Sequence, residues 1–431
     1  MMICPGAPTG VSGQQACLTQ PWGIVMKKCI VFIEASLAGA GAEACAQVKA
    51  MGLNVVLFCQ SPAAYPTAIR DHCNDILSLN TLNEDALFRA VCAVSKKFLI
   101  VGLTTTSNRF IAQPDKMSII LGLPGNRPET MDTLLDRALL RASLESLAPE
   151  LNPPYCVGGR ASDMRAFVQR HGFPLMAKPQ RHTGLNSKMV SSQDELAAFQ
   201  AQCKAQNSEV LLETVQSGDE YSLYLLKPAD DELMVVGAIK RIRQCNACGE
   251  FVQVEASFPS DEALTQRMAA AIAPLLEKVG FEIGIMRIDY MLSEDQFKIL
   301  TLRPGLGEDA QDCQMIASAT GLSLIQALLI TAQGRSLPWI PTQQLGVALH
   351  RLTIPSAGYV LGLENQEDIT QLPGVESLTL SADPEKIYTP DDAGCGEIGS
   401  VLVTQPSAEE ARQLARKISA MALVSISATR V

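Results

Sequence analysis

Short apolar runs alternate with helical patterns along the first part of the chain. The runs are rich in Val, Ile, Leu and Phe, which is typical of buried strands. They cover residues 29–33, 53–58, 75–77 and 98–101. Helical patterns separate them, one ending at Met51 before Gly52 and another covering 84–94. Strands that alternate with helices predict a doubly wound parallel sheet.

A different pattern follows the Pro- and Gly-rich stretch at 124–128, which is typical of a linker. Apolar runs now come in neighbouring pairs, as antiparallel strands do. These strands are expected at 175–178, 188–190, 210–213, 221–226, 234–240, 285–292 and 297–302. Helices are expected at 130–147, 162–171, 194–203, 261–279 and 312–333. Beyond Pro341, strands at 346–354, 375–381, 399–404 and 423–426 and a helix at 407–422 predict a small α+β cap.

These changes of pattern predict a multi-domain α/β protein. An N-terminal parallel-sheet domain is expected at 26–125, and an α+β domain at 126–345. The C-terminal cap is expected at 346–431. Residues 1–25 lack the charged and apolar regions of a signal peptide and are predicted to be disordered. Met26 opens a strand pattern and is a second candidate for the start of translation.

Composition narrows the classes of partner. The chain has 431 residues, 47% of them hydrophobic, with 35 basic and 45 acidic residues and a net charge of −10. An acidic chain without a basic run is not expected to bind nucleic acid. No apolar run approaches the roughly 18 residues of a membrane span. The 13 cysteines are dispersed, which indicates a reducing compartment and a cytoplasmic protein. Cys245 and Cys248 form a lone CxxC, interpreted as an ordinary loop because no second ligand pair accompanies it.

Two charged residues lie within or at the end of apolar strands. Asp289 lies inside the first strand of the hairpin at 285–302, where an acid is costly unless it is paired or binds a metal. Lys178 ends the strand 175–178 and is followed by the polar loop 180–187. A lysine beside a glycine-containing loop suits a phosphate chain, because the ammonium neutralises charge while backbone N–H groups cradle oxygens. A solvated lysine at a strand end is the alternative.

The order and spacing of these segments resemble the ATP-grasp ligases, in the branch of biotin-carboxylase-like and amino-acid or dipeptide ligases. The resemblance extends from about residue 28 to the C-terminus, and it implies that the domain at 126–345 is an ATP-grasp domain with lobes at about 126–207 and 208–345. The hairpin at 285–302 is similar to the family's metal-binding hairpin, and Gly-x-Pro-x-x-x-Lys-Pro at 172–179 to its phosphate-binding strand. The stretch 394–403, followed by a helix, resembles the family's cap.

The resemblance implies that the chain binds ATP. Lys178, Thr183, Gly184 and Ser187 would contact phosphate, with Arg137 at the place of an earlier family lysine. The stretch 211–222 is similar to a family segment that holds the nucleotide. It implies that Glu213 belongs to the nucleotide site, that Thr214 and Val215 face adenine, and that Glu220 faces the ribose or Lys240. Lys240 resembles a catalytic lysine before a mobile substrate loop, here 241–250.

The resemblance also implies Mg²⁺, with Asp289 as the first ligand. In the family the second strand ends in Glu-x-Asn-x-Arg, whereas this chain has Thr301, Arg303 and Gly305 at those positions. Two outcomes stay open. In one, nearby acids replace the missing ligands and Arg303 neutralises phosphate; these acids are Glu308, Asp309 and Asp312. In the other, phosphoryl transfer has been lost.

The activity that the resemblance implies is ATP-dependent carboxylate–amine ligation. The product would be an amide or peptide bond formed through an acylphosphate, from small-molecule carboxylate and amine substrates that resemble amino acids. Arg303 and Lys240 would be the catalytic residues, and ATP and Mg²⁺ the cofactors. A homodimer is the assembly common in this branch. The alternative is a catalytically inactive ATP-grasp-fold protein that binds a nucleotide or metabolite or serves as a partner subunit.

Overall fold

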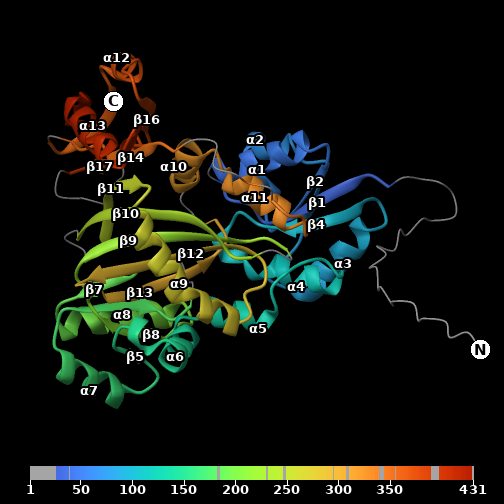
Figure 1. Cartoon of the computed structure of the whole chain (residues 1–431), viewed down its shortest axis with the longest axis horizontal. Helices are drawn as coiled ribbons and strands as arrows, with labels where there is room; N and C mark the ends of the chain where they lie inside the picture. Colours follow the sequence, from blue (N-terminus) through green and yellow to red (C-terminus); the bar gives the residue numbers. More distant parts are fainter. Residues whose placement is uncertain are drawn as a thin grey trace, which may run out of the picture.

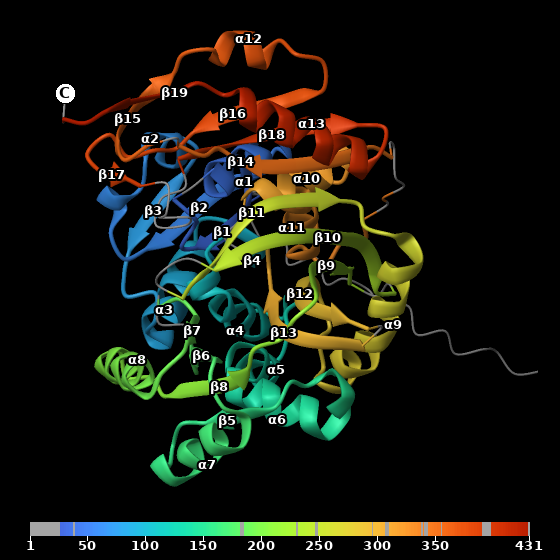
Figure 2. The ribbon, with the colours of Figure 1, turned by 90° about the vertical axis from the view of Figure 1, so that its left-hand side faces the viewer.

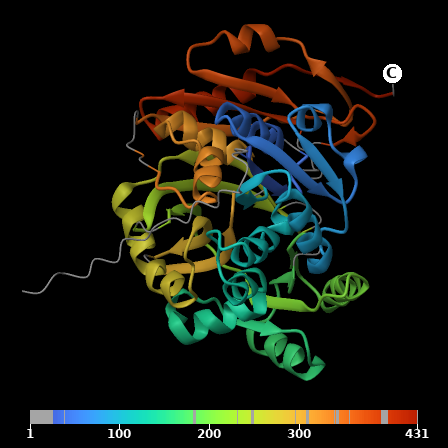
Figure 3. The same cartoon turned by 90° about the vertical axis from the view of Figure 1, so that its right-hand side faces the viewer.

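The computed structural model describes residues 26–429, apart from 38, 182–184, 230–231, 246–248, 295, 307–309, 338, 340–343, 355 and 390–397. The extension predicted at 1–25 lies outside the described residues. A four-stranded parallel sheet, a small four-stranded sheet, an eight-stranded sheet and a three-stranded sheet make up the described part (Figure 1). The N-terminal sheet and the eight-stranded sheet lie side by side, with the small sheet at one end of the molecule and the C-terminal elements at the other (Figures 2 and 3).

The N-terminal domain is the parallel sheet that the sequence predicted. Its order is β3-β2-β1-β4, with β1 (Lys28–Ile33), β2 (Asn54–Cys59), β3 (Asp75–Ser78) and β4 (Leu99–Thr104). Helices α1 (Gly39–Ala50), α2 (Thr67–Arg70), α3 (Glu84–Val94) and α4 (Ala112–Ile120) connect or flank the strands, with short 3-10 turns η1 (Pro62–Ala64) and η2 (Asn108–Phe110). Alternate side chains of β1 enter two different cores, one with α1 and one with α3. Burial on both faces explains the continuous apolar runs.

The small sheet has the order β5-β8-β6-β7. Its strands are β5 (Tyr155–Val157), β6 (Leu175–Pro179), β7 (Lys188–Val190) and β8 (Val210–Thr214), accompanied by α7 (Ala161–His171) and α8 (Gln193–Ala205). The strand at 210–214, predicted to open the second lobe, pairs antiparallel with β6 in this sheet. That pairing sets Met176 opposite Glu213 and Lys178 opposite Leu211.

The helix predicted at 130–147 is two helices, α5 (Pro128–Leu135) and α6 (Arg137–Leu147), and this corrects the sequence prediction. Asp136 separates them and has extended backbone angles. Its carboxylate accepts the backbone N–H of Ala138 at 2.9 Å and so caps α6. Asp is a preferred N-cap residue, because its oxygen satisfies one of the free N–H groups of the first turn. The break places Arg137 at the start of a helix.

The large sheet has the order β13-β12-β9-β10-β11-β14-β18-β16. Its strands are β9 (Asp219–Lys227), β10 (Met234–Cys245), β11 (Phe251–Phe258), β12 (Gly284–Ser293), β13 (Gln296–Pro304), β14 (Gly346–Arg351), β16 (Val375–Leu380) and β18 (Gly399–Gln405). The β12–β13 hairpin was predicted from the sequence. The loop predicted from 241 instead begins as strand, since β10 continues to Cys245. The last three strands lie beyond the boundary predicted at residue 346, so the predicted cap contributes strands to the large sheet.

Helices and a small sheet complete the fold. Helix α9 (Glu262–Lys278) packs on one face of the large sheet. The other helices are α10 (Ala310–Thr320), α11 (Leu324–Thr331), α12 (Gln366–Thr370) and α13 (Ala408–Met421), with the 3-10 turn η3 (Pro149–Leu151). The three-stranded sheet has the order β17 (Ile387–Tyr388), β15 (Gly358–Leu363), β19 (Val424–Ser427). The helix predicted at 312–333 is broken at Gly321, and Ser323 caps α11. No single described helix is long and apolar enough to cross a membrane, and α10 with α11 meets that test only as a pair bent by 100°.

Candidate functional site

A cavity of about 540 Å³ lies between the small sheet and the large sheet. Among the described residues, its positively charged lining side chains are Arg137, Lys178, Arg241, Arg243, Arg287, Arg303 and Arg351. Its acidic lining residues are Glu213, Glu220, Glu250 and Asp289. The excess of cations favours an anionic ligand, since low-dielectric walls strengthen the attraction. The cavity is within the size range of small-molecule sites.

Gly249, just before β11, connects the large sheet to the small sheet beside this cavity. Met189 of β7 donates its backbone N–H to the carbonyl of Gly249 at 2.7 Å. A Cβ atom at Gly249 would lie 2.4 Å from the Met189 carbonyl oxygen, and its φ of +80° also favours glycine. Asn186 and Ser187, from the loop before β7, line the cavity beside this contact. Backbone contact between the two lobes therefore depends on a residue without a side chain.

One group of charges in the cavity, the lysine cluster, consists of Arg141, Lys178 and Glu213. Glu213 Oε1 accepts Arg141 Nε at 2.7 Å, and Glu213 Oε2 lies 2.7 Å from Lys178 Nζ. The Leu300 carbonyl of β13 also accepts from Lys178 at 3.1 Å and from Arg141 at 3.0 Å. Two buried cations thus share one buried carboxylate and one carbonyl of the opposite lobe, leaving one surplus positive charge.

Burial changes the acid–base behaviour of the lysine cluster. It lowers the pKa of Lys178 to about 8, although the Glu213 carboxylate opposes this. Burial by itself would raise the pKa of Glu213, but Arg141 and Lys178 hold it below its usual value. Arg137 lines the cavity nearby and donates to the Pro179 carbonyl. Burial lowers its pKa to about 10, with the positive charge of Arg303 adding to the effect. Arg137 therefore stays charged at neutral pH.

Side-chain alternation on the large sheet determines which residues face the cavity. Glu220 and Ser222 lie on the same face of β9, and Arg241 and Arg243 on the same face of β10. Glu220 pairs with Arg243 at 2.8 Å and lines the cavity. Burial raises its pKa despite that pairing. The opposite face carries the apolar residues that pack against α9.

The second group of charges, the arginine cluster, consists of Arg241, Arg287, Arg303, Asp289 and Asp312. Asp289 Oδ1 accepts Arg287 Nε at 2.8 Å, and its Oδ2 lies 3.7 Å from Arg303 Nε. Burial by itself would raise the pKa of Asp289, but these arginines hold it well below its usual range. Asp289 is therefore a charged carboxylate compensated by guanidinium groups.

Asp312 lies beneath the cavity, at the start of α10. Its carboxylate accepts from Arg241 and from the Tyr224 hydroxyl, and it lies 3.2 Å from Arg287 Nη1. Ser222 links the two acids of the cluster, because its hydroxyl donates to Asp289 and accepts from Arg241 Nε at 2.6 Å. The arrangement holds Arg241 and Arg287 in one orientation each. The structure thus places Asp312 with arginines and not beside Asp289 as a second metal ligand.

The residues at this end of the cavity do not fit magnesium as the structure describes them. Mg²⁺ prefers oxygen ligands in a nearly ideal octahedron about 2.0–2.1 Å away, commonly one or two carboxylates with phosphate and water. Asp289 instead faces Arg287, Arg303 and the Ser222 hydroxyl. No group of three or more His, Cys, Asp or Glu within the described ranges could hold a metal ion. The candidate ligands Glu308 and Asp309 lie outside the described residues.

Lys240, expected as a catalytic residue, does not line the cavity. It pairs with Asp219 at 2.7 Å and lies over the ring of Tyr221, on the face of the sheet opposite Arg241. Neighbouring strand residues point to opposite faces, so a shift of one position exchanges the cavity for the other side. The structure therefore assigns the cavity position to Arg241.

The structure brings most of the other expected residues together. The cavity is lined by Arg137, Lys178, Ser187, Glu213, Thr214, Val215, Glu220, Asp289 and Arg303. Their roles toward ATP remain predictions. Thr183 and Gly184 lie outside the described residues.

Sequence reasoning missed Arg141, which pairs with the cavity residue Glu213, and several residues of the cavity itself, namely Arg241, Arg243, Gln253, Arg287 and Arg351. A signal existed for Arg287, because it lies two residues before Asp289 and so shares its strand face. Arg241 and Arg243 are also two residues apart and so share a strand face, but the sequence does not say which face of β10 meets the cavity. Arg141 lies one helical turn after Arg137. Arg351 ends β14, far away in sequence, and only the pairing of β14 with β11 brings it near.

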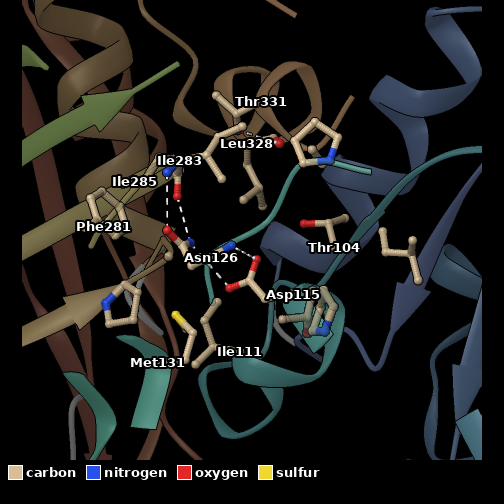
Figure 4. A pocket seen from close by; sticks show the side chains of 18 residues that line it. Thr104, Ile111, Asp115, Asn126, Met131, Phe281, Ile283, Ile285, Leu328 and Thr331 are labelled. Carbon is tan, nitrogen blue, oxygen red and sulfur yellow. Dashed lines mark hydrogen bonds between the residues drawn. The ribbon is translucent and has the colours of Figure 1, made fainter. Parts of the chain in front are cut away.

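A second, much smaller cavity of about 60 Å³ lies where the N-terminal domain meets the large sheet (Figure 4). Asn126 spans this junction. Its side chain donates to the Ile283 carbonyl at 2.9 Å and accepts from the Glu282 N–H, also at 2.9 Å, while its own backbone N–H donates to Asp115 at 3.1 Å. Burial raises the pKa of Asp115 to about 6. This junction joins the domains and is too small for a substrate.

Solved structures show which fold this is. L-amino acid ligase from Bacillus licheniformis superposes with a TM-score of 0.75 at 15% identity, covering 94% of this chain and 100% of that chain. The biotin carboxylase domain dimer of Hydrogenobacter thermophilus 2-oxoglutarate carboxylase, in complex with MgADP, ADP and bicarbonate, superposes with a TM-score of 0.66 at 12% identity, covering 93% and 91%. The chain therefore has the ATP-grasp fold, as its sequence predicted.

Sequence comparison refines this class. Residues 350–427 match the family described as L-amino acid ligase C-terminal domain 2. The uncharacterized protein y4rH of Sinorhizobium fredii is 22% identical over 397 residues, which cover 90% of this chain and 80% of that protein. The chain thus has the ATP-grasp fold and a C-terminal segment that is similar to that of L-amino acid ligases. Arg351 belongs to the matched C-terminal segment and also lines the cavity.

Proposed function

We propose that this chain is an ATP-dependent carboxylate–amine ligase that forms an amide bond between amino-acid-like substrates. The observation that carries the proposal is the cation-lined cavity between the two lobes, which gathers Arg137, Lys178 and Glu213 with the segment Thr214–Val215. An ATP-grasp fold and a C-terminal segment that matches L-amino acid ligases support it. A biotin carboxylase domain of this fold carries MgADP, which supports a nucleotide as the ligand.

The proposed reaction has two steps. A substrate carboxylate oxygen attacks the γ-phosphorus of ATP, the bond to ADP breaks, and an acylphosphate forms. The substrate amine then attacks the acyl carbon, phosphate leaves, and the nitrogen loses a proton. Lys178 and Arg137 would neutralise the phosphate chain, and Arg303 the charge near the transferred group. The contact between the two lobes at Gly249 and Met189 would help to limit the access of water to the acylphosphate.

The test is turnover by the purified full-length chain. Phosphate release would be screened with ATP across pairs of L-amino acids, and mass spectrometry would identify the amide product. Lys178→Met should reduce turnover by about 100-fold or more, because a phosphate contact and a buried positive charge are both lost. Arg267→Gln, on the exposed side of α9, is the matched control and should turn over normally. Absence of product from every pair, with ATP bound, would contradict the ligase proposal.

A second candidate is a non-catalytic protein that binds a nucleotide or metabolite, or serves as a partner subunit. The observation that favours it is the environment of Asp289, whose carboxylate faces Arg287 and Arg303 where metal-dependent members have further metal ligands. Binding of ATP without product or phosphate release would support this candidate.

We also propose that the protein forms a homodimer and is located in the cytoplasm.

A further inference from the structure

A cavity of about 500 Å³ lies at the outer edge of the small sheet. It is bordered by β5, the edge strand of that sheet, which lies next to α6 and α7 (Figures 1 and 2). None of the described residues that line it also lines the cavity between the lobes. Its volume is within the range of small-molecule sites, and the proposed reaction does not use it.

The backbone of β5 presents hydrogen-bonding groups to this edge cavity. The carbonyl of Pro154 accepts from β8 at 3.1 Å, and the N–H of Gly158 donates to the residue that begins β8 at 2.7 Å. In an antiparallel pair, the residues that alternate with these point their N–H and C=O groups away from the partner strand. They are Tyr155 and Val157, and no residue that the structure describes accepts from their N–H groups. The outer side of β5 can therefore pair with an additional strand.

The walls of the edge cavity lie on both faces of β5. On one face, Tyr155 donates its hydroxyl to Glu145 of α6 at 2.7 Å. On the other face, Cys156 packs against the apolar core that contains Phe167 of α7. Neighbouring strand residues point to opposite faces, so the cavity extends around the edge of the strand from α6 to α7. An extended chain of three residues is roughly 10 Å long and matches β5, which has 3 residues.

The edge cavity holds charges of opposite sign that are not paired with each other. Arg170 and His171 belong to the last turn of α7, and Glu145 belongs to α6. Within the described ranges no ion pair joins Glu145 to either of these basic residues, and Tyr155 occupies only one of its two carboxylate oxygens. Separated charges of opposite sign suit a zwitterion whose ammonium and carboxylate are apart, because each end of the ligand then meets an opposite charge.

We propose that the edge cavity binds a short free peptide, two or three residues long, as an additional strand on β5. The peptide backbone would exchange hydrogen bonds with Tyr155 and Val157, as in other cases of strand addition. Its carboxylate would face Arg170 and its ammonium Glu145. The ligand class follows from this cavity alone. Only the origin of the peptide, as a product of amide-bond formation, rests on the proposed function.

The experiment is a calorimetric titration of trialanine into the full-length protein. Amidation of the peptide's carboxylate should weaken binding at least about tenfold, because a charge-assisted contact is lost. Acetylation of its amine should weaken binding about threefold or more, since the ammonium is lost. Arg170→Gln should bind trialanine about tenfold more weakly. Arg165→Gln is the matched control, because Arg165 is exposed on the same helix outside the cavity, and it should bind as the wild type does.

A proline at the strand edge tests the backbone contacts. Val157→Pro removes an N–H that points away from β8, and proline is tolerated at such edge positions. This change should weaken trialanine binding about tenfold, whereas Val157→Ala keeps the N–H and should stay within about threefold of the wild type. An equal loss in both variants would overturn the added strand. Circular dichroism checks the folding of both variants, and if Val157→Pro does not fold, Arg170→Gln against Arg165→Gln decides.

The remaining outcomes separate the edge cavity from the cavity between the lobes. Lys178→Met should leave trialanine binding unchanged, and a tenfold loss would place the peptide between the lobes and overturn the proposal. Absence of binding at about 10 mM trialanine, or equal binding of the amidated peptide, would also overturn it. Equal binding of the acetylated peptide would overturn the free peptide in favour of the C-terminus of a partner chain.

The results also separate this proposal from the ligase proposal. Trialanine binding at the edge cavity by a protein that forms no amide from any substrate pair would overturn the ligase alone. Amide formation by a protein that does not bind trialanine would overturn the edge site alone.

Discussion

The lysine cluster and the arginine cluster both contribute residues to the lining of one cavity, but the two respond differently to pH. In the lysine cluster the cation that lines the cavity is Lys178, whose pKa burial lowers to about 8. In the arginine cluster the most exposed cation is Arg303, and a guanidinium remains charged at any ordinary pH. The cavity thus has a titratable half at the lysine cluster and a permanently charged half at the arginine cluster.

The clusters also differ in how closely they follow the ATP-grasp pattern. The strand that ends at Lys178 and the acid at Glu213 keep the residues expected of the nucleotide side. The β12–β13 hairpin keeps its backbone and Asp289 but has Thr301 and Arg303 at the expected ligand positions. The comparison teaches that a fold can preserve the shape of a hairpin while individual side chains on it differ in charge from the expected pattern.

The largest expected effect is on the free energy of unfolding. It tests whether Glu213 and Asp312 compensate the buried cations of their clusters equally well. Glu213→Gln leaves Arg141 and Lys178 buried without their shared carboxylate, and Asp312→Asn does the same to Arg241 and Arg287. Each change should lower the unfolding free energy by about 3–5 kcal/mol, because an uncompensated buried charge is costly. Urea denaturation measures it.

The control for both changes is Glu277→Gln, an exposed residue of α9, which should lose less than about 0.5 kcal/mol. A small loss in only one of the two buried variants would show that water reaches that cluster. That cluster would then be solvated, and the two clusters could not be compared as equally buried groups of charges.

The second largest expected effect is on the pH dependence of ATP affinity. It distinguishes the titratable charge of the lysine cluster from the permanent charge of the arginine cluster. Lys178 has a pKa below that of an ordinary lysine, so it is positively charged below about pH 8 and becomes neutral above it. The affinity for ATP should therefore fall by up to about tenfold between pH 7 and pH 9, as one charged contact weakens. Lys178→Arg should remove this fall, because arginine stays charged.

Calorimetric titrations at both pH values, with EDTA present, measure this effect. A fall of the same size in Lys178→Arg would assign the titration to another group and end the distinction between the two halves.

The smallest expected effect is that of Lys240→Gln. Comparing it with a change of the neighbouring Arg241 tests which face of β10 meets the cavity. Lys240→Gln breaks a partly exposed ion pair with Asp219, and such pairs contribute about 0–1 kcal/mol. It should leave ATP affinity unchanged, whereas Arg241→Gln, one residue along, should destabilise the protein and weaken binding. Thermal unfolding and calorimetry compare the two variants. A tenfold loss of affinity in Lys240→Gln would return this lysine to the site.

Several features of the site could be predicted from short-range pattern. Asp289 stood out because it lies inside an apolar strand, where a charge is costly without a partner, and Lys178 because it ends a strand before a polar, glycine-containing loop. Arg137 and Glu213 were expected from their spacing relative to family segments, and both line the cavity. Such signals are local, because the periodicity of a strand and the cost of burial act on consecutive residues.

Other features depended on contacts that the local pattern does not contain. Which face of β10 meets the cavity depends on its pairing with β9 and β11, and this decided between Lys240 and Arg241. The partners of Asp289 come from β9, β12 and β13, and those of Asp312 from β9, β10 and β12. Strand order brings these residues together across up to 88 positions in sequence.

The sequence by itself determined the class of this protein: a parallel-sheet domain, an antiparallel hairpin with a buried acid, and the order of segments of an ATP-grasp fold. Periodicity and hydrophobic burial are properties of consecutive residues, so they can be read along the chain. Only the tertiary structure decided that Asp289 is compensated by arginines, because ion pairing depends on distances between side chains from several strands. The chemistry of the hairpin follows from those distances.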